Sequence, residues 1–208
     1  MSLSPEPALR FVGGRLALDF VNIVPARREL SWDQLIAFLE SAQIITAERG
    51  RELLALYGSD PQSAESLLGK AQRLGSALRM AFEALLHRHR IASEWVEPVN
   101  DILRVTEGHD ELVSGDRDWR IEFVAREGGL EWLLAAVARS AAEIIAEGPQ
   151  ARLRLCANPR CGLFFYDTSR TRRRRWCSMT VCGNRSKVAA FARRQASAPR
   201  QNPEQRPR

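Results

Sequence analysis

All four cysteines of this 208-residue chain lie within one short segment, residues 156–182. Four residues separate Cys156 from Cys161, four separate Cys177 from Cys182, and fifteen lie between the two pairs. Two close pairs of thiolates complete the tetrahedral shell of a metal ion at little loop-closure cost. The spacing therefore predicts one structural zinc ion per chain. A zinc ion held by four sulfurs has no open position for water or substrate.

Two other interpretations of the cysteines remain open. The first is that they form disulfides or are unrelated buried thiols, and the second is that they hold an iron–sulfur cluster. The first residues, MSLSPEPALRFVGG, lack the apolar core of a signal peptide, and no stretch is long and apolar enough for a membrane span. We therefore expect a cytoplasmic protein, away from the membrane, whose thiols stay reduced. An iron–sulfur cluster would use the same ligands, but nothing in the sequence indicates a redox partner.

The segment around the cysteines is too small to fold on a hydrophobic core alone. We expect the metal to supply the missing stability, so that Cys177→Ser unfolds this segment and leaves residues 1–147 folded. Gly162 and Gly183 each follow the second cysteine of a pair. A glycine tolerates positive φ there, which would let the backbone turn tightly around a bound sulfur.

The net charge of +6 conceals two regions of opposite sign. Residues 151–208 hold 15 of the 31 Lys+Arg and two of the 25 Asp+Glu, a net charge of +13. Residues 1–150 keep 16 basic and 23 acidic residues, a net charge of −7. Only the C-terminal region therefore has the charge of a nucleic-acid-binding surface.

The candidate nucleic-acid contacts fall in the loop between the cysteine pairs and in the helix expected after them. They are Arg170, Arg172, Arg173, Arg174, Arg175, Arg185, Lys187, Arg193 and Arg194. Guanidinium groups bind phosphate bidentately, so DNA is the expected partner. In the helix we expect Val188, Phe191 and Ala192 to pack on the zinc core and the cations to face outward.

RNA is the first alternative partner, because single-strand binders use aromatic rings as stacking platforms. The cysteine-rich segment supplies four such rings: Phe164, Phe165, Tyr166 and Trp176. Trp176 adjoins a predicted ligand, so it either stacks on a base or packs the small core.

The rest of the chain has mainly helical periodicity. The expected elements are helices near 31–42, 46–58, 63–90, 94–105 and 130–147, a strand at 119–124, extended segments over 9–24 and a polar connection at 106–118. Ser31 and Gln34 form a capping-box pattern at the first helix. We expect a mostly α fold with a few short β-strands. It comprises a helical domain (1–148), a zinc module of hairpin or knuckle and helix (149–196), and a disordered basic tail (197–208).

Asp19 and Asn22 are polar residues inside an apolar segment, so they either line a ligand pocket or brace the backbone. No phosphate loop, nucleophile elbow or HExxH motif occurs. An enzyme housed in residues 1–148 is therefore the least favoured function. A domain that senses a small-molecule effector or forms a homodimer is the leading hypothesis for this region.

Two sequence motifs resemble known families. The run CANPRCGLFFYDTSRTRRRRWCSMTVCGNR followed by SKVAAFARR resembles the CGNR zinc-finger family over residues 151–196. The opening GGRLALDFVN is similar to the start of the ABATE domain, which usually precedes that finger. The resemblance implies that the four cysteines are the zinc ligands. It also implies a bacterial stress-induced transcription regulator.

Overall fold

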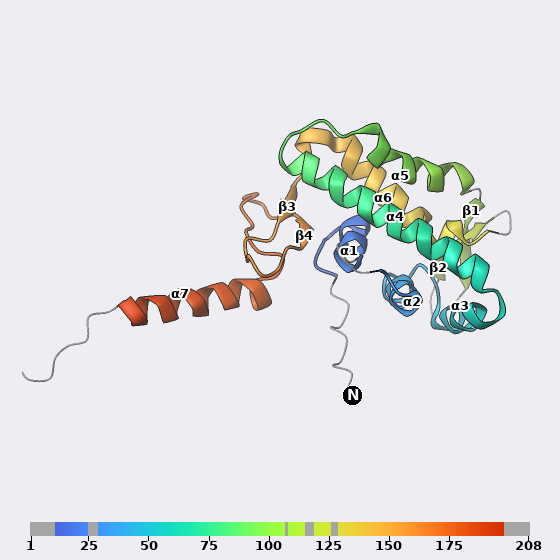
Figure 1. Ribbon diagram of the computed structural model, residues 1–208, viewed down its shortest axis with the longest axis horizontal. Coiled ribbons are helices and arrows are strands. Elements are labelled where there is room, and N and C mark those ends of the chain that lie inside the picture. The colour runs from blue at the N-terminus through green and yellow to red at the C-terminus, as the bar shows by residue number, and fades with distance from the viewer. Residues whose placement is uncertain (1–10, 25–28, 107, 115–118, 126–128, 198–208) are drawn as a thin grey trace, which may run out of the picture.

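The structure is a computed structural model that describes residues 11–24, 29–106, 108–114, 119–125 and 129–197. Most of the described chain is helical, with two short two-stranded sheets, which confirms the expected fold class (Figure 1). The predicted tail lies outside the described residues except Ser197, which ends the last helix. None of the described helices is both long and apolar enough to cross a membrane.

Six α-helices build the described residues of the N-terminal part. They are α1 (Leu16–Ile23), α2 (Trp32–Ser41), α3 (Ala47–Ser59), α4 (Pro61–Leu86), α5 (Ser93–Val105) and α6 (Ala135–Glu147). A 3-10 turn, η1 (Glu131–Leu134), precedes α6, so the helix expected from 130 begins as a tighter turn.

Local capping signals explain where three of these helices begin. Ser31 and Gln34 form the predicted capping box at α2, each side chain bonded to the backbone of the other residue. Thr46 accepts the N–H of Arg49 at α3, and Asp60 accepts the N–H of Ser63 at α4. These side chains satisfy backbone donors that would otherwise lack a partner.

The expectation of extended structure over 9–24 was wrong for residues 16–23, which form the helix α1, and residues 9 and 10 lie outside the described part of the chain. Alternation fails as a guide here because α1 is buried on almost every side by α6, α4 and the hairpin of the zinc module. Ala17, Leu18, Phe20 and Val21 are all fully buried. A helix that is buried on most of its sides lacks the solvent-facing polar side by which an amphipathic helix is recognised.

The longest described helix, α4, runs the length of the helical body with α5 and α6 packed against it (Figure 1). Its buried residues recur every three or four positions, as in Leu67, Leu74, Leu78 and Phe82. This spacing places them on the face that meets α1, α5 and α6.

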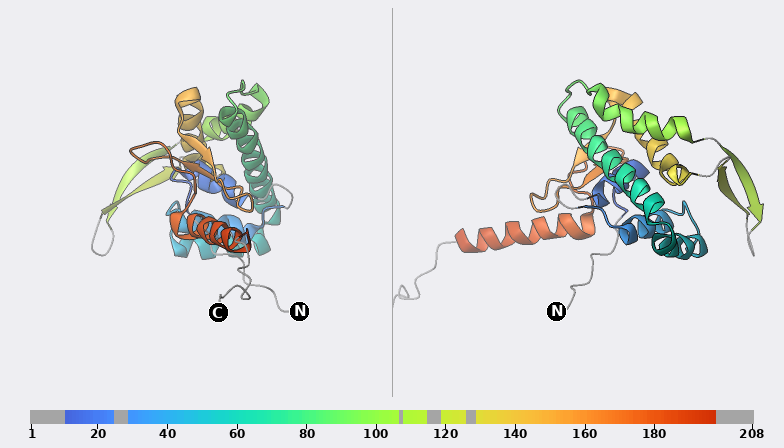
Figure 2. Two further views of the ribbon diagram at one scale, coloured as in Figure 1. Left: turned by 90° about the vertical axis from the view of Figure 1, so that its left-hand side faces the viewer. Right: turned by 45° about the vertical axis from the view of Figure 1, so that its right-hand side comes forward.

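The polar connection expected at 106–118 contains a strand, so that expectation was wrong. Strand β1 (Gly108–Ser114) pairs antiparallel with β2 (Trp119–Ala125), the strand that the alternation predicted. The sequence GHDELVS has little strand propensity of its own, and it is held by its pairing with β2. The hairpin projects from the helical body (Figure 2).

A second hairpin joins the zinc module to the helices. After the short turn η2 (Gly148–Gln150), β3 (Leu153–Leu155) pairs antiparallel with β4 (Phe164–Tyr166). Leu153, Phe164 and Tyr166 belong to the same buried cluster as the helices. The domain boundary drawn from the sequence falls at η2, but the hydrophobic core continues across it.

Candidate metal centre and basic surface

The first cysteine pair sits on the β3–β4 hairpin. Cys156 directly follows β3, and its N–H donates to the carbonyl of Leu163 at 2.9 Å. Cys161 lies in the connecting turn, where its N–H donates to Asn158. Gly162 has a φ of +66°, so the prediction of a left-handed glycine is confirmed at this position.

The second cysteine pair lies at a short helical turn, with Cys177 just before it and Cys182 inside it. Cys177 precedes Ser178, whose carbonyl accepts the N–H groups of Cys182 and Gly183, both at 3.0 Å. The turn is a short π-helix, η3 (Met179–Gly183). Gly183 is not among the positive-φ residues, so the reason predicted for this glycine was wrong. A Cβ there would lie 2.9 Å from Sδ of the exposed Met179 side chain, which would have to shift to make room for it.

The four Sγ atoms all lie within 4.8 Å of one another, and three of the four cysteines are buried. Sγ of Cys177 lies 3.6 Å from Cys161 and 3.7 Å from Cys182. A tetrahedron with Zn–S bonds of 2.3 Å has S···S edges of about 3.8 Å, whereas a disulfide bond is about 2.05 Å long. All four cysteines are free, so the arrangement fits one tetrahedral metal ion.

The electrostatics of the cluster call for a cation. Burial and the neighbouring sulfurs raise the pKa of Cys177. Burial opposes ionisation of Cys156 too, but hydrogen bonds from backbone and neighbouring thiols hold its pKa below the usual value. Four thiolates this close repel one another unless a metal ion neutralises them. The side-chain amide of Asn158 lies 3.6 Å from Sγ of Cys182 and can donate to it.

The arginine loop, residues 167–176, is folded around one buried carboxylate, which the sequence analysis did not single out. Asp167 is fully buried. It accepts the N–H and hydroxyl of Ser169, at 3.0 and 2.6 Å, and the N–H of Arg174 at 3.0 Å. Burial alone would raise the pKa of Asp167, but these bonds and the charge of Arg154 lower it. A charged Asp167 therefore shapes the loop at neutral pH.

Arg174 has a different place from the other candidate contacts. Its Nε donates to the carbonyl of Trp176 at 2.9 Å, and its guanidinium also donates to the carbonyl of Cys177. The same group lies 4.8 Å over the ring of Phe165. Arg174 thus ties the loop to the second cysteine pair, and its bonds inside the module compete with any external phosphate.

The other candidate cations are exposed. They are Arg170, Arg172, Arg173, Arg175, Arg185, Lys187, Arg193 and Arg194. Four belong to the arginine loop and four to α7 (Asn184–Ser197). The structure thus brings two groups of cations to the surface of one module.

The predicted packing of α7 on the zinc core was wrong. Val188 and Phe191 are 68% and 57% exposed, and α7 projects from the body (Figures 1 and 2). The helix starts at Asn184, directly after η3, so no intervening loop turns it back onto the core. Among the described elements its main contact is η3.

Asp19 and Asn22 both bond to backbone groups. Asp19 accepts the N–H of Gly13 at 2.7 Å. Burial raises the pKa of Asp19, against the opposing effect of backbone N–H groups. Asn22 accepts the N–H of Phe164 and donates to its carbonyl, both at 2.9 Å. The bracing role is thus present in the structure, and a ligand contact by these residues stays a prediction.

The aromatic side chains of the module are mostly internal. Phe164 and Phe165 are fully buried, and Tyr166 is 7% exposed. Trp176 is half-buried and packs against the cysteine cluster, with Arg175 lying 5.1 Å over its ring. Of the two roles open to Trp176, packing of the small core is the one observed.

Two family models match this chain. The CGNR zinc finger model matches residues 152–195. The ABATE model, a family described as "Putative stress-induced transcription regulator", matches residues 14–148, more than half of the chain. No curated protein matches the chain significantly. With the four clustered sulfurs and the helical domain ahead of them, these matches show that the chain belongs to the ABATE family and carries a C-terminal CGNR zinc finger.

Proposed function

We propose that this protein is a cytoplasmic transcription regulator that binds DNA through the basic surface of its zinc finger. One observation carries the proposal: among described residues 151–197 the only acidic side chain, Asp167, is fully buried, while eight of the nine candidate cations are exposed. A surface with exposed cations and no exposed carboxylate attracts a polyanion.

The arginine loop and α7 would have different roles in DNA binding. The described structure gives no ion-pair partner to the loop side chains of Arg170, Arg172 and Arg173, so they are available to phosphates. Phosphate contacts give affinity without sequence choice. Lys187 and Arg194 are carried by a regular helix, which is better suited to reading base edges in a groove.

The metal that organises this surface would be a single zinc ion per chain, held by Cys156, Cys161, Cys177 and Cys182. X-ray absorption on the purified protein should give four sulfur ligands at about 2.3 Å from zinc. Iron in place of zinc, or fewer than three sulfurs per metal, would contradict this assignment.

DNA is favoured over RNA because three of the four aromatic rings that could stack on bases are buried, and the fourth, Trp176, packs against the cysteine cluster. Phe164, Phe165 and Tyr166 are buried, so stacking on single-stranded RNA would require the hairpin to open. The test is a titration of duplex DNA and single-stranded RNA at one salt concentration. Tighter binding of the RNA would replace DNA by RNA as the partner.

Arg173→Ala should weaken duplex binding for all sequences alike. Arg51→Ala removes the same charge from an exposed position on α3 and should leave binding unchanged. Equal losses from both variants would indicate a response to net charge alone. Selection from a random duplex library would then define the preferred site.

For residues 1–148 we propose a regulatory role, as an effector-sensing or dimerisation domain, and no catalytic one. The support is the shared core: α1 packs on β4, and Asn22 bonds to the backbone of Phe164. A change at α1 would therefore reach the zinc finger through packed side chains.

A further inference from the structure

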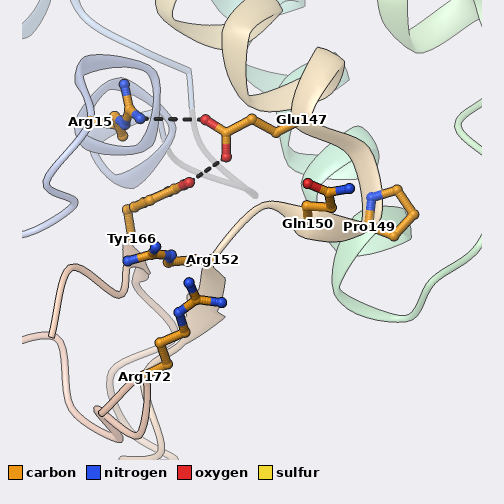
Figure 3. A pocket seen from close by; sticks show the side chains of 7 residues that line it. All are labelled: Arg15, Glu147, Pro149, Gln150, Arg152, Tyr166 and Arg172. Atoms are coloured by element: carbon orange, nitrogen blue, oxygen red, sulfur yellow. Dashed lines mark hydrogen bonds and ion pairs between the residues drawn. The ribbon is translucent and has the colours of Figure 1, made fainter. Parts of the chain in front are cut away.

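A cavity of about 710 Å³ lies where α1, the end of α6 and the zinc finger meet (Figure 3). Its lining is polar and comes from segments far apart in the sequence. The lining side chains that matter here are Arg15, Glu147, Gln150, Arg152, Tyr166 and Arg172. The volume is within the range of small-molecule sites, about 300–1,000 Å³.

Three guanidinium groups face one carboxylate in this cavity, so its lining carries a net positive charge. Glu147 is already engaged: Arg15 lies 3.4 Å from its carboxylate, and the hydroxyl of Tyr166 donates to it. Arg15 also lies 4.8 Å over the Tyr166 ring. These contacts make a fixed wall of Arg15, Tyr166 and Glu147.

Arg152 and Arg172 also line the cavity, and Figure 3 shows their side chains near each other, with Arg152 beside Tyr166. Within the described residues, neither guanidinium has a hydrogen bond or an ion pair. Arg172 has a φ of +51°, and its carbonyl accepts a bond from the guanidinium of Arg154. The backbone that carries Arg172 is therefore held, although its side chain has no partner among the described residues.

We propose that this cavity binds a small dianion of the phosphate type, such as a phosphorylated metabolite. Guanidinium groups donate paired hydrogen bonds to phosphate oxygens. Arg152 and Arg172 are the primary ligands, and Arg15 adds a third positive charge to the lining. The polar lining disfavours an apolar ligand.

Because of the position of the cavity, a bound ligand would regulate DNA binding, an inference that rests on the proposed function. Arg172 belongs to the arginine loop, and Arg15 immediately precedes α1. A dianion held between them would withdraw Arg172 from nucleic-acid phosphates. Occupancy of the cavity should therefore weaken DNA binding.

The test is calorimetric titration of inorganic phosphate into the zinc-loaded full chain, without nucleic acid. We expect one site per chain that is weakened at least about tenfold by Arg152→Ala combined with Arg172→Ala, because each removes charged hydrogen bonds. The matched control is Arg170→Ala combined with Arg173→Ala, which removes the same charge from exposed loop positions outside the cavity. The control should change the affinity by less than about threefold.

Absence of phosphate binding, or equal losses in the two double variants, would overturn the site. Arg172→Ala alone alters one exposed side chain, so a loss of affinity in this variant cannot be ascribed to unfolding. Duplex binding is then measured in phosphate and in chloride of equal ionic strength. In the wild type, duplex binding should be weaker in phosphate than in chloride. In the Arg152 and Arg172 double variant, the two salts should give the same affinity. If phosphate binds but duplex DNA does not, the site stands and the proposed function fails.

Discussion

The adjacent phenylalanines of β4 provide a matched test of how the zinc finger is attached. Phe164 and Phe165 are both fully buried, but Phe164 belongs to the helical core and Phe165 to the cysteine cluster. The ring of Phe164 lies 6.1 Å from that of Phe82, with the guanidinium of Arg79 at 5.5 Å. Truncation of a fully buried phenylalanine costs about 3–5 kcal/mol. Phe164→Ala should therefore destabilise the N-terminal helices although it lies in the finger.

Hydrogen exchange resolves where each substitution acts. In Phe164→Ala the free energy of unfolding should fall by about 3–5 kcal/mol. Since about 1.4 kcal/mol corresponds to a tenfold change in an equilibrium constant, exchange of the α4 core amides should be roughly 10²–10⁴-fold faster. Phe165→Ala should instead speed exchange around the cysteines, with α4 changed by less than about tenfold. Unchanged protection of α4 in Phe164→Ala would refute the shared core. So would equal effects of the two variants on α4.

Three further predictions concern the cysteine cluster, the buried Asp19 and the exposed helix α7. Cys177→Ser should speed hydrogen exchange in the segments around the cysteines while β3 and β4 stay protected, because the helical core holds the hairpin. Loss of protection throughout the chain would show instead that the zinc finger and the helices unfold as one unit. Burial raises the pKa of Asp19 in the folded state, so the wild type should lose stability relative to Asp19→Asn as pH rises from about 4 toward neutral, as measured by urea unfolding midpoints. If the wild type instead lost stability relative to this variant as pH falls, the direction of the pKa shift would be contradicted. Phe191→Ala should change the unfolding temperature by no more than about 1–2 °C, because the side chain is 57% exposed, and a larger loss would reveal that α7 is covered, as in a homodimer.

The sequence predicted those features that depend on local chemistry. The cysteine spacing placed four sulfurs that meet in space, and the Ser31 capping box located the start of α2. Amphipathic periodicity located α4, α5 and α6 to within a few residues. Each of these signals lies within one segment, where residue types and spacing determine the outcome.

The features that were predicted wrongly depend on long-range contacts. Helix α1 is surrounded by partners that its own sequence does not identify, and β1 is a strand because β2 pairs with it. The internal role of Arg174 requires the carbonyl groups of Trp176 and Cys177 to face it, which no charge count reveals. The exposure of Phe191 follows from the direction in which α7 leaves the metal centre.

The most direct test of the central claim is the salt dependence of duplex DNA binding by the zinc-loaded chain. If about six phosphates are neutralised by the exposed cations, log K should fall against log salt concentration with a slope of roughly −5. Arg173→Ala should reduce that slope by about one unit. Binding that is weak at low salt, or nearly independent of salt, would contradict the claim. The basic surface would then have another partner, such as an acidic protein.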